Sequence, residues 1–518
     1  MTAECDFLVI GAGSAGCLVA RTLDLHGYKV RLVEAGPPTP PLRRPVDYLQ
    51  TFGTEQDWRF RTVPQPGLAG RRLDQPRGRG PGGSTRINAM IWYPPRDADL
   101  QRLHRAGGDD WSPNRLAASL TAVTQAVSPQ PPRWLSETAR RFLSRSTAEA
   151  VDPPHAFARM ADRQGRLTAA DLLTDRPTIE TIAAHVDRVL FGDDPLAKPH
   201  SIDLSPTRAV GVLVHPHSAD ATCEERKSLP LFARHGVILC GGSFASPSIL
   251  LRSGIGAPDA IAAHGLKPRI AINAVGQNLV DHLIMPITFA TSGRDRFPTP
   301  LSTADLARWQ IAATGPAASN LAEAGAIYSL NSDSSSGREF QVHVTPTHYL
   351  LYPDRRAPAA MTVGINLCQP RSRGAVDLAA ADPFTPPLID PGYLTETTDL
   401  DDLVAAVIQV RQLVAAGSLA TGGGAELIPG GTKTTVAAIA KAVRRFSQTL
   451  YHPCGTCRIG VDADSVVDPD CRVRGTESLH VIDASVFPEV PTVNPNATVM
   501  MIAHHAATRL AASFDAAS

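Results

Sequence analysis

Apolar runs of a few residues, each ending in a glycine turn or an acid, recur along this chain and predict buried parallel strands. The first run covers residues 7–10, and a second strand is expected over residues 29–33, before Glu34. Between them lies a glycine turn at residues 11–16. An apolar periodicity follows over residues 17–25 and stops before Gly27, which predicts a helix. Strand, glycine turn, helix and strand in this order predict a βαβ unit.

The glycine turn has the Gly-x-Gly-x-x-Gly spacing of a dinucleotide-binding loop. Gly11 permits the tight turn, Gly13 lets the backbone approach a pyrophosphate, and Gly16 allows the helix to pack closely on the strand. Glu34 follows the second strand and can accept hydrogen bonds from ribose hydroxyls, which makes NADP the least favoured ligand. The turn by itself leaves NAD and FAD open.

Two later segments also carry ligand-loop or buried-strand patterns. Residues 78–88 (GRGPGGSTRIN) present free backbone N–H groups and hydroxyls that suit a phosphate or the edge of a flavin ring, and the alternative is a flexible surface loop. Residues 236–240 are typical of a buried strand. A helix is expected over residues 246–251, with Pro247 at its first position.

The second half of the chain carries a different, β-type pattern. Strands are expected over residues 339–345, 361–367 and 375–378. Residues 400–413 have helical spacing, and Gly417 ends the helix. These elements support a second sheet, backed by a helix, beside the parallel one.

Composition and charge exclude several classes of protein. The chain has 518 residues, enough for more than one domain, and its 50 basic residues balance its 50 acidic ones, so neither nucleic acid nor an anionic membrane is an expected partner. No run approaches the roughly 18 apolar residues of a membrane span, and the N-terminus lacks a signal pattern. The eight cysteines are scattered, and Cys454 and Cys457 are interpreted as packed thiols rather than a redox pair or half a zinc site. We expect a cytoplasmic enzyme without a metal site.

Candidate catalytic groups gather near the end of the chain. His452 has an ordinary pKa of about 6.5, which suits a base near neutral pH, although a lone histidine before a proline is more often structural. A strand is expected over residues 479–483, and Asp483 closes it. Asn494 and Asn496 flank a proline, a pattern that also favours turns.

Taken together, these motifs resemble those of the glucose–methanol–choline (GMC) oxidoreductases, a family of FAD-dependent enzymes. The resemblance covers residues up to 36, 78–88, 242–256, 276–282 and the tail from residue 451, in the family's order. It implies an α/β fold in which a Rossmann-like FAD-binding domain is interleaved with an α+β substrate-binding domain built on an antiparallel sheet. The first domain would comprise residues 1–118, 185–283 and 452–518, and the second residues 119–184 and 284–451.

The resemblance also implies an activity and the residues that perform it. His452 would accept the hydroxyl proton of a primary or secondary alcohol while a hydride leaves for flavin N5, and Asn494 would hydrogen-bond the substrate oxygen. Asp483 would meet the ribityl or pyrophosphate part of FAD, and Val186 the adenine. The full set implied to bind FAD is Gly11, Gly13, Ser14, Ala15, Gly16, Glu34, Ala35, Gly83, Ser84, Asn88, Ala89, Met90, Val186, Tyr451, Asp483, Ala484 and Pro495. The electron acceptor is left open between oxygen, a quinone and another carrier.

Departures from the family pattern change some of these expectations. Ile87 stands where some members carry a histidine bonded covalently to FAD, which implies noncovalent FAD. Pro81 replaces an aliphatic residue and His504 a glutamate, while the short region 111–176 suggests a reduced lid. His282 is expected to structure a loop near the cofactor.

Three other functions compete with alcohol oxidation. A flavin-containing lyase of the hydroxynitrile-lyase type would use His452 as a base with redox-silent FAD. An NAD-dependent dehydrogenase would bind no flavin, and a flavin-bound interaction or sensing protein would not need His452 for any turnover.

Overall fold

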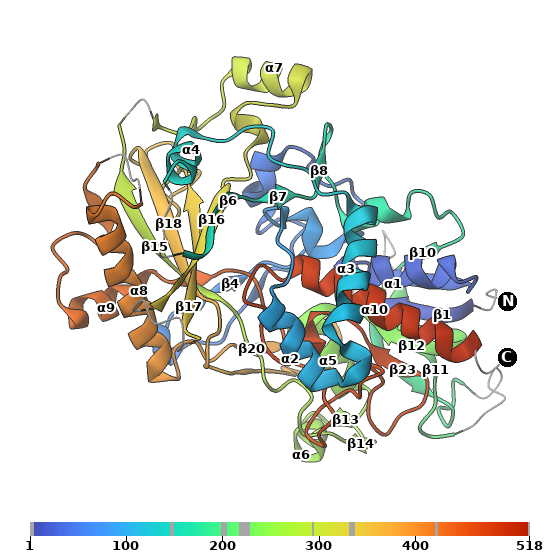
Figure 1. Cartoon of the computed structure of the whole chain (residues 1–518). Helices are drawn as coiled ribbons and strands as arrows, with labels where there is room; N and C mark the ends of the chain where they lie inside the picture. Colours follow the sequence, from blue (N-terminus) through green and yellow to red (C-terminus); the bar gives the residue numbers. More distant parts are fainter. Residues whose placement is uncertain are drawn as a thin grey trace.

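The computed structural model describes residues 5–145, 150–197, 205–216, 228–292, 295–330, 337–419 and 423–515. Two large sheets with helices around them form two halves of the molecule, at the right and the left of Figure 1. Cys223 lies outside the described residues. Within the described part of the chain, no helix is long and apolar enough to cross a membrane.

The right-hand half is built on a sheet that contains the predicted βαβ unit. Its six strands are β1 (Cys5–Ile10), β2 (Val30–Glu34), β10 (Glu180–Phe191), β11 (Ala209–Pro216), β12 (Leu229–Leu239) and β23 (Leu479–Val481). β1 pairs in parallel with β2 and β12, β2 with the start of β10, and β12 with β23. The rest of β10, β11 and the first part of β12 pair antiparallel, so β10 and β12 take part in both kinds of pairing.

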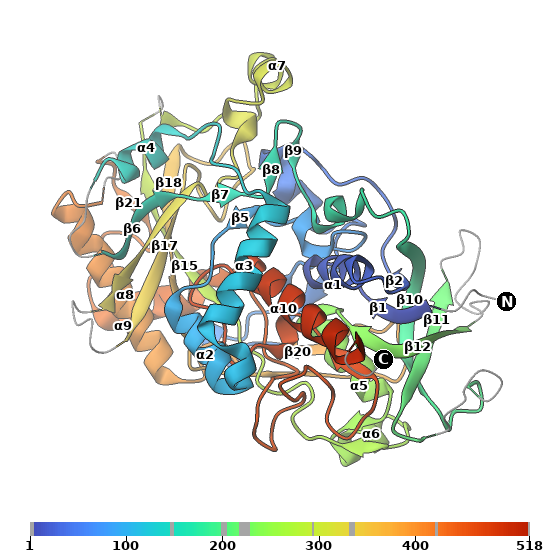
Figure 2. The same cartoon turned by 45° about the vertical axis from the view of Figure 1, so that its right-hand side comes forward.

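Three helices lie side by side over this sheet. They are α1 (Ser14–Leu25), α10 (Asn496–Asp515) and α3 (Pro113–Val127) (Figures 1 and 2). Phe7 of β1, Leu18 of α1 and Ala507 of α10 belong to one buried apolar cluster. The end of the chain therefore returns beside its start, and the parallel strands with α1 between β1 and β2 confirm the predicted βαβ unit.

The left-hand half is built on an antiparallel sheet of seven strands. In order across the sheet they are β21 (Glu426–Ile428), β15 (Leu283–Ala290), β18 (Ala360–Leu367), β17 (Glu339–Thr345), β16 (Ala324–Ser329) and β6 (Ala150–Ala156), and β22 (Gln448–Thr449) pairs with β15. Helices α8 (Thr397–Ala415) and α9 (Val436–Phe446) pack on its outer face (Figure 1). The predicted second sheet and its helix are confirmed, but the strand expected over residues 375–378 is not part of this sheet and pairs in a separate two-stranded one.

Alternate residues of β17 point to opposite faces of this sheet, as the period of a strand requires. Phe340 and Val344 join the apolar core under α8 and α9. Gln341 and His343 are as deeply buried but polar, and His343 faces the other half of the molecule. The sheet therefore presents a polar inner face toward the parallel sheet.

The remaining elements are short or peripheral. The helices are α2 (Asp97–Gly107), α4 (Glu137–Leu143), α6 (Pro258–Ala263) and α7 (Thr303–Ala312). The strand pairs are β3 (Phe60–Arg61) with β4 (Asp74–Gln75), β5 (Ile91–Trp92) with β7 (Ala158–Arg159), β8 (Ala161–Asp162) with β9 (Gly165–Arg166), β13 (Ile255–Gly256) with β14 (Ile270–Ala271), and β19 (Ala375–Asp377) with β20 (Leu388–Asp390).

Helix α5 (Gly242–Arg252) begins four residues earlier than the sequence predicts, and Pro247 lies inside it rather than at its first position. An internal proline leaves a carbonyl without its helical partner. Thr456 Oγ1 donates to that carbonyl, at Ser243, over 2.8 Å. Asp483 Oδ2 accepts from the Gly242 backbone N–H at 2.7 Å. The prediction was wrong because the groups that stabilise this helix come from the distant tail.

Two elements cross the predicted domain boundaries. β10 begins at Glu180, before the boundary at 184/185, and α3 spans the boundary at 118/119 while packing on α10. β15 begins at Leu283, beside the boundary at 283/284. The division into an FAD-binding and a substrate-binding domain stays a prediction.

Candidate active site

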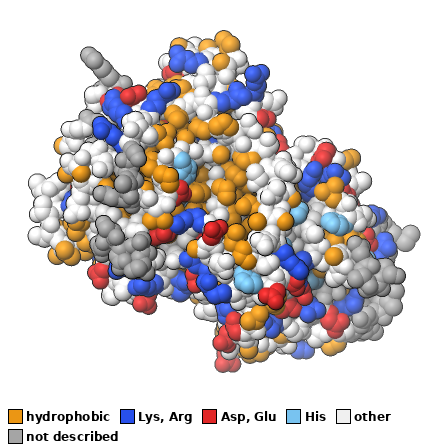
Figure 3. Space-filling model, in the orientation of Figure 1, with side chains coloured by type: hydrophobic (Ala, Val, Ile, Leu, Met, Phe, Trp, Pro, Cys, Tyr) orange, Lys and Arg blue, Asp and Glu red, His pale blue; other side chains and the backbone are white. Residues whose placement is uncertain are grey.

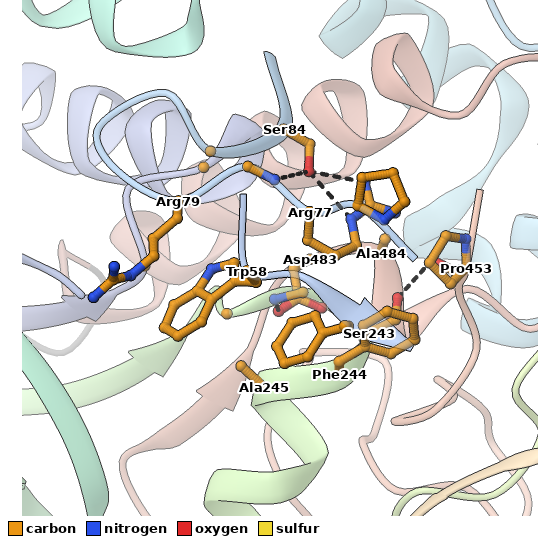
Figure 4. A pocket seen from close by; sticks show the side chains of 18 of the residues that line it. Trp58, Arg77, Arg79, Ser84, Ser243, Phe244, Ala245, Pro453, Asp483 and Ala484 are labelled. Carbon is orange, nitrogen blue, oxygen red and sulfur yellow. Dashed lines mark hydrogen bonds between the residues drawn. The ribbon is translucent and has the colours of Figure 1, made fainter. Parts of the chain in front are cut away.

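One continuous cavity of about 730 Å³ lies between the two halves. Its walls run from the glycine turn at Gly11 and Gly13 to the side chains of His452 and Asn494. Figure 3 shows hydrophobic side chains gathered in the upper centre of one face of the molecule, and Figure 4 shows part of the cavity from close by. We call the part near the glycine turn the cofactor end and the part near His452 the substrate end.

The cofactor end is shaped by glycines in close contact. A Cβ on Gly16 would lie 1.8 Å from the carbonyl oxygen of Gly11, and one on Gly83 would lie 2.6 Å from the Cα of Gly13. Gly13 precedes α1, whose N-terminus has neither a side-chain cap nor an acid in its first turn. The free N–H groups of that first turn therefore form a site for an anion, as a dinucleotide's pyrophosphate requires.

Glu34 joins the two glycine loops through its carboxylate. Oε2 accepts from the backbone N–H of Ala12 at 2.8 Å, and Oε1 accepts from Gly36 at 2.7 Å and Gly80 at 3.1 Å. Each oxygen can accept more than one hydrogen bond, so Oε2 keeps capacity for a hydroxyl. Glu34 lines the cavity beside Ala35, where the sequence places a ribose.

The second glycine loop is tied to the tail. Ser84 Oγ accepts from Arg77 Nη2 at 2.8 Å and from the Gly78 backbone N–H at 3.2 Å (Figure 4). Arg77 Nη1 also donates to the carbonyl of Tyr451 at 3.0 Å. Nearby, Asn88 Oδ1 accepts from the backbone N–H of Met90 at 2.9 Å. The loop is thus an ordered wall of the cavity, and the flexible-loop alternative is wrong.

Asp483 anchors the start of α5 at the cavity wall. Oδ2 accepts from Ser246 Oγ at 2.6 Å as well as from Gly242, and Oδ1 accepts from the backbone and hydroxyl of Ser485 at 2.7 and 2.6 Å. Burial raises the pKa of Asp483, and these hydrogen bonds oppose that shift. Asp483 thus links α5 to the segment after β23 and lines the cofactor end of the cavity (Figure 4).

The structure brings nearly all of the predicted site residues to this cavity. All of them line it except Gly16 and Met90, which are buried beside it. Gly16 contributes by packing α1 against the first glycine, as its place in the turn predicts. Ile87 also lines the cavity.

His452 and Asn494 lie together at the substrate end. His452 Nε2 is 3.3 Å from Asn494 Nδ2, and its Nδ1 is 2.9 Å from Nδ1 of His282. The backbone N–H of His452 donates to Asp281 Oδ1 at 2.8 Å. His452 lies in the turn after β22, and Asn494 lies just before α10. These two segments place both polar side chains in the cavity.

The surroundings of His452 keep its imidazole neutral at neutral pH. Burial lowers its pKa well below 6.5, and repulsion from His282, His343 and Arg77 acts in the same direction. A neutral imidazole has a nitrogen lone pair and can accept a proton. Asp281 is fixed close by, with Thr449 Oγ1 donating to its Oδ2 at 2.7 Å and the Tyr393 hydroxyl donating to the same oxygen.

Sequence reasoning missed most residues of the substrate end. The lining there includes Tyr48, Phe52, Ile284, His343, Thr345 and Tyr349. Phe52 and Tyr451 meet edge to face with ring centroids 5.5 Å apart. Burial lowers the pKa of His343 to about 3, so this ring is neutral too. A usable signal existed in residues 339–345, where polar side chains alternate with apolar ones in a strand.

Cys454 and Cys457 are both buried and free, and burial raises the pKa of each thiol. Among the described residues, no group of three or more histidine, cysteine or acidic side chains is placed to hold a metal ion. The two thiols are packed groups. His282 lies against His452.

Comparison with known proteins agrees with this geometry. Family models described as GMC oxidoreductase match residues 176–284 and 370–503. The alcohol dehydrogenase (acceptor) of Pseudomonas putida is 30% identical to this chain over 99% of it and 97% of its own length. The oxygen-dependent choline dehydrogenase of Brucella canis is 29% identical over 98% of this chain and 95% of its own. The crystal structure of pyridoxine 4-oxidase from Mesorbium loti is similar with a TM-score of 0.82 at 26% identity, covering 98% of this chain and 99% of that one.

Proposed function

Since the chain belongs to the GMC oxidoreductase family and is an FAD-dependent oxidoreductase acting on CH–OH donors, we propose that it converts a primary or secondary alcohol into a carbonyl compound with His452 as the base. The observation that supports this most is the contact between a neutral His452 and Asn494, 3.3 Å apart, in the same cavity that the glycine turns line. A base, an amide donor and a dinucleotide site then converge on one bound alcohol.

Two side chains divide the work on the hydroxyl group. His452 Nε2 takes the proton, and Asn494 Nδ2 donates a hydrogen bond to the alcohol oxygen, which stabilises the negative charge that develops there. FAD held at the cofactor end would supply the acceptor for the hydride that leaves the carbinol carbon. Buried Asp281 accepts the backbone N–H of His452 and so fixes the position of this residue.

We assign FAD binding to the cofactor end and to residues 1–118, 185–283 and 452–518. The free N–H groups at the start of α1 suit the pyrophosphate, and Glu34 Oε2 suits a ribose hydroxyl. Ile87 supports noncovalent attachment, because a hydrocarbon side chain offers no atom that can bond to a flavin. Acid denaturation of the purified protein should therefore release all of its FAD into solution, and flavin retained on the precipitate contradicts this.

The substrate end favours an uncharged alcohol with an aromatic or apolar group. Among the described residues that line the cavity, the carboxylates are Glu34 and Asp483, and both belong to the cofactor end. Tyr48, Phe52 and Tyr451 instead offer ring surface. A choline-type cation would find no carboxylate in the described lining of the substrate end, because Asp281, beside His452, is buried outside the cavity.

An anaerobic screen tests the proposal. Purified holoenzyme is mixed with benzyl-type, aliphatic and choline-type alcohols, and the yellow absorbance of the flavin is followed. Bleaching by a neutral aromatic alcohol, and not by choline, is the expected result. A flavin that stays yellow with every alcohol while the protein cleaves a cyanohydrin would indicate a lyase, and the proposal would be rejected.

A further inference from the structure

His282 lies directly behind His452, away from the bulk of the cavity. It is fully buried and immediately precedes β15. Its Nδ1 is 2.9 Å from Nδ1 of His452, and its Nε2 is 3.2 Å from the carbonyl oxygen of Cys368. The two rings stand 74° apart in plane with their centroids separated by 5.2 Å.

These contacts determine where the protons lie. A carbonyl oxygen can only accept, so Nε2 of His282 carries a proton. Burial lowers the pKa of His282, which keeps this ring neutral with a lone pair on Nδ1. A hydrogen bond between the two Nδ1 atoms then requires His452 to donate, which places the lone pair of His452 on Nε2.

The contact on the other side of His452, with Asn494, independently indicates the same tautomer. Asn494 Nδ2 is an amide nitrogen and can only donate, so Nε2 of His452 must accept over their 3.3 Å contact. Asn494 Oδ1 in turn accepts from Gln341 Nε2 at 3.5 Å. Every donor in this row of residues points the same way, from Gln341 toward Cys368.

We propose that His282 is the positioning residue that holds His452 in the tautomer with the proton on Nδ1, so that Nε2 faces the substrate as an acceptor. This rests on the proposed role of His452 as the base. In the reaction the alcohol O–H bond breaks and an N–H bond forms at Nε2. The resulting imidazolium keeps its Nδ1–H bonded to His282, while the hydride and its electron pair leave the carbon for FAD.

Charged and titratable groups around the two rings come from several elements. Asp281 precedes His282, His343 faces them from β17, Arg77 comes from the second glycine loop, and Asp99 of α2 acts on His282. Arg77 disfavours a second proton on His452, and Asp281 and Asp99 favour one on His282. Among the described residues, none of these groups hydrogen-bonds either ring, so the tautomer depends on His282, Asn494 and the Cys368 carbonyl.

Two substitutions separate hydrogen-bond acceptance from mere packing. His282→Asn places an amide oxygen near the former Nδ1 and can still accept from His452, whereas His282→Leu fills the space without an acceptor. We expect His282→Leu to slow anaerobic reduction of the flavin by an alcohol about 10²-fold and His282→Asn to slow it less than about 10-fold. His480→Leu, which removes another buried imidazole outside the cavity, is the matched control and should keep the wild-type rate.

The tautomer itself is read by NMR of the holoenzyme labelled with ¹⁵N-histidine, with His452→Ala used to identify the signals. The wild type and His282→Asn should show a protonated Nδ1 and a bare Nε2 on His452, and His282→Leu should show a protonated Nε2. A protonated Nε2 in the wild type would overturn the inference, and so would an unchanged tautomer and rate in His282→Leu. The wild-type spectrum tests which nitrogen of His452 carries the proton even if His282→Leu fails to fold.

The proposed function can fail separately from this inference. If His452→Ala reduces its flavin with an alcohol at the wild-type rate, His452 is not the base, whatever its tautomer is. If His452→Ala is inactive but the wild-type tautomer carries its proton on Nε2, the base stands and the role of His282 is wrong.

Discussion

The cofactor end of the cavity is built largely from backbone, whereas the substrate end is built from side chains contributed by distant segments. At the cofactor end, glycines approach so closely that a methyl group on Gly16 or Gly83 would overlap a neighbouring main chain. At the substrate end, His452, Asn494 and His343 come from three different parts of the fold. The difference teaches that the closely packed glycines of the first end cannot be changed without loss of the fold, whereas we expect the side chains of the second end to be replaceable.

Gly16→Ala should have the largest effect of any single change at the cofactor end. Its Cβ would lie 1.8 Å from the Gly11 carbonyl oxygen, so α1 cannot keep its contact with β1. We expect no folded, yellow protein, judged by flavin absorbance and thermal unfolding. Gly431→Ala is the matched control, since nothing lies within 4 Å of its added Cβ.

Gly13→Ala tests whether the two glycines of the same turn have different roles, packing for Gly16 and ligand approach for Gly13. An added Cβ there meets only the Cα of Gly83, at 3.9 Å, so the protein itself has room for it. We expect this variant to fold but to hold FAD weakly, because the methyl group occupies the space of the phosphates. Loss of folding in Gly13→Ala, or normal FAD content in Gly16→Ala, would contradict the assignment of packing to one glycine and ligand approach to the other.

Asn494→Ala should leave folding and FAD content intact and slow the reaction. Removing one donor that stabilises developing negative charge costs about 10²–10³-fold in kcat. Asn494→His keeps an N–H donor and should recover much of the loss. The rate of anaerobic flavin reduction by a reactive alcohol is the measurement, and equal rates for both variants would argue against a hydrogen-bond role.

Thr456→Val tests the hydrogen bond that connects the C-terminal segment of the chain to helix α5 at the cofactor end. The change leaves the Ser243 carbonyl without the donor that replaces the missing N–H of Pro247. A buried carbonyl without a partner costs about 1–3 kcal/mol, which should appear as a lower free energy of unfolding in urea. Thr121→Val removes an exposed hydroxyl within α3 and should change that free energy by less than about 0.5 kcal/mol.

The pH dependence of the substrate end should be the smallest effect. His452 acts as a base when it carries no proton, so its activity is complete above its pKa and falls as the pH drops through that pKa. Burial holds this pKa well below 6.5. The rate of flavin reduction should therefore stay constant from about pH 8 down to 6.5 and decline only below it. A decline centred above pH 6.5 would show that the imidazole is less desolvated than the structure indicates.

Much of the cofactor end could be predicted from the sequence, because its conformation depends on local glycine spacing. The turn at residues 11–16 and the loop at residues 78–88 both line the cavity as the sequence indicates. The start of α5 could not be predicted, since Thr456 and Asp483 stabilise it from more than 200 residues away.

The substrate end was harder to predict, because its residues also come together only through contacts between distant parts of the chain. His452 and Asn494 were found by resemblance of the tail to a family, not by local pattern. Gln341 and His343 look like ordinary members of an alternating strand, and only the packing of the two sheets shows that their side is the inner one. His282 was expected to structure a loop near the cofactor, and that stays a prediction. Its hydrogen bond with the proposed base could not be predicted, because only the pairing of β15 with β22 brings the two rings together.

The most direct test of the central claim compares anaerobic reduction of the flavin by one neutral alcohol in the wild type and in His452→Ala, at equal FAD content. We expect rapid bleaching of the wild type, at a rate about 10²–10⁴ times that of the variant, with the carbonyl product formed in equal amount to the reduced flavin. Equal rates in the two proteins, or a wild-type flavin that no alcohol bleaches, would contradict it.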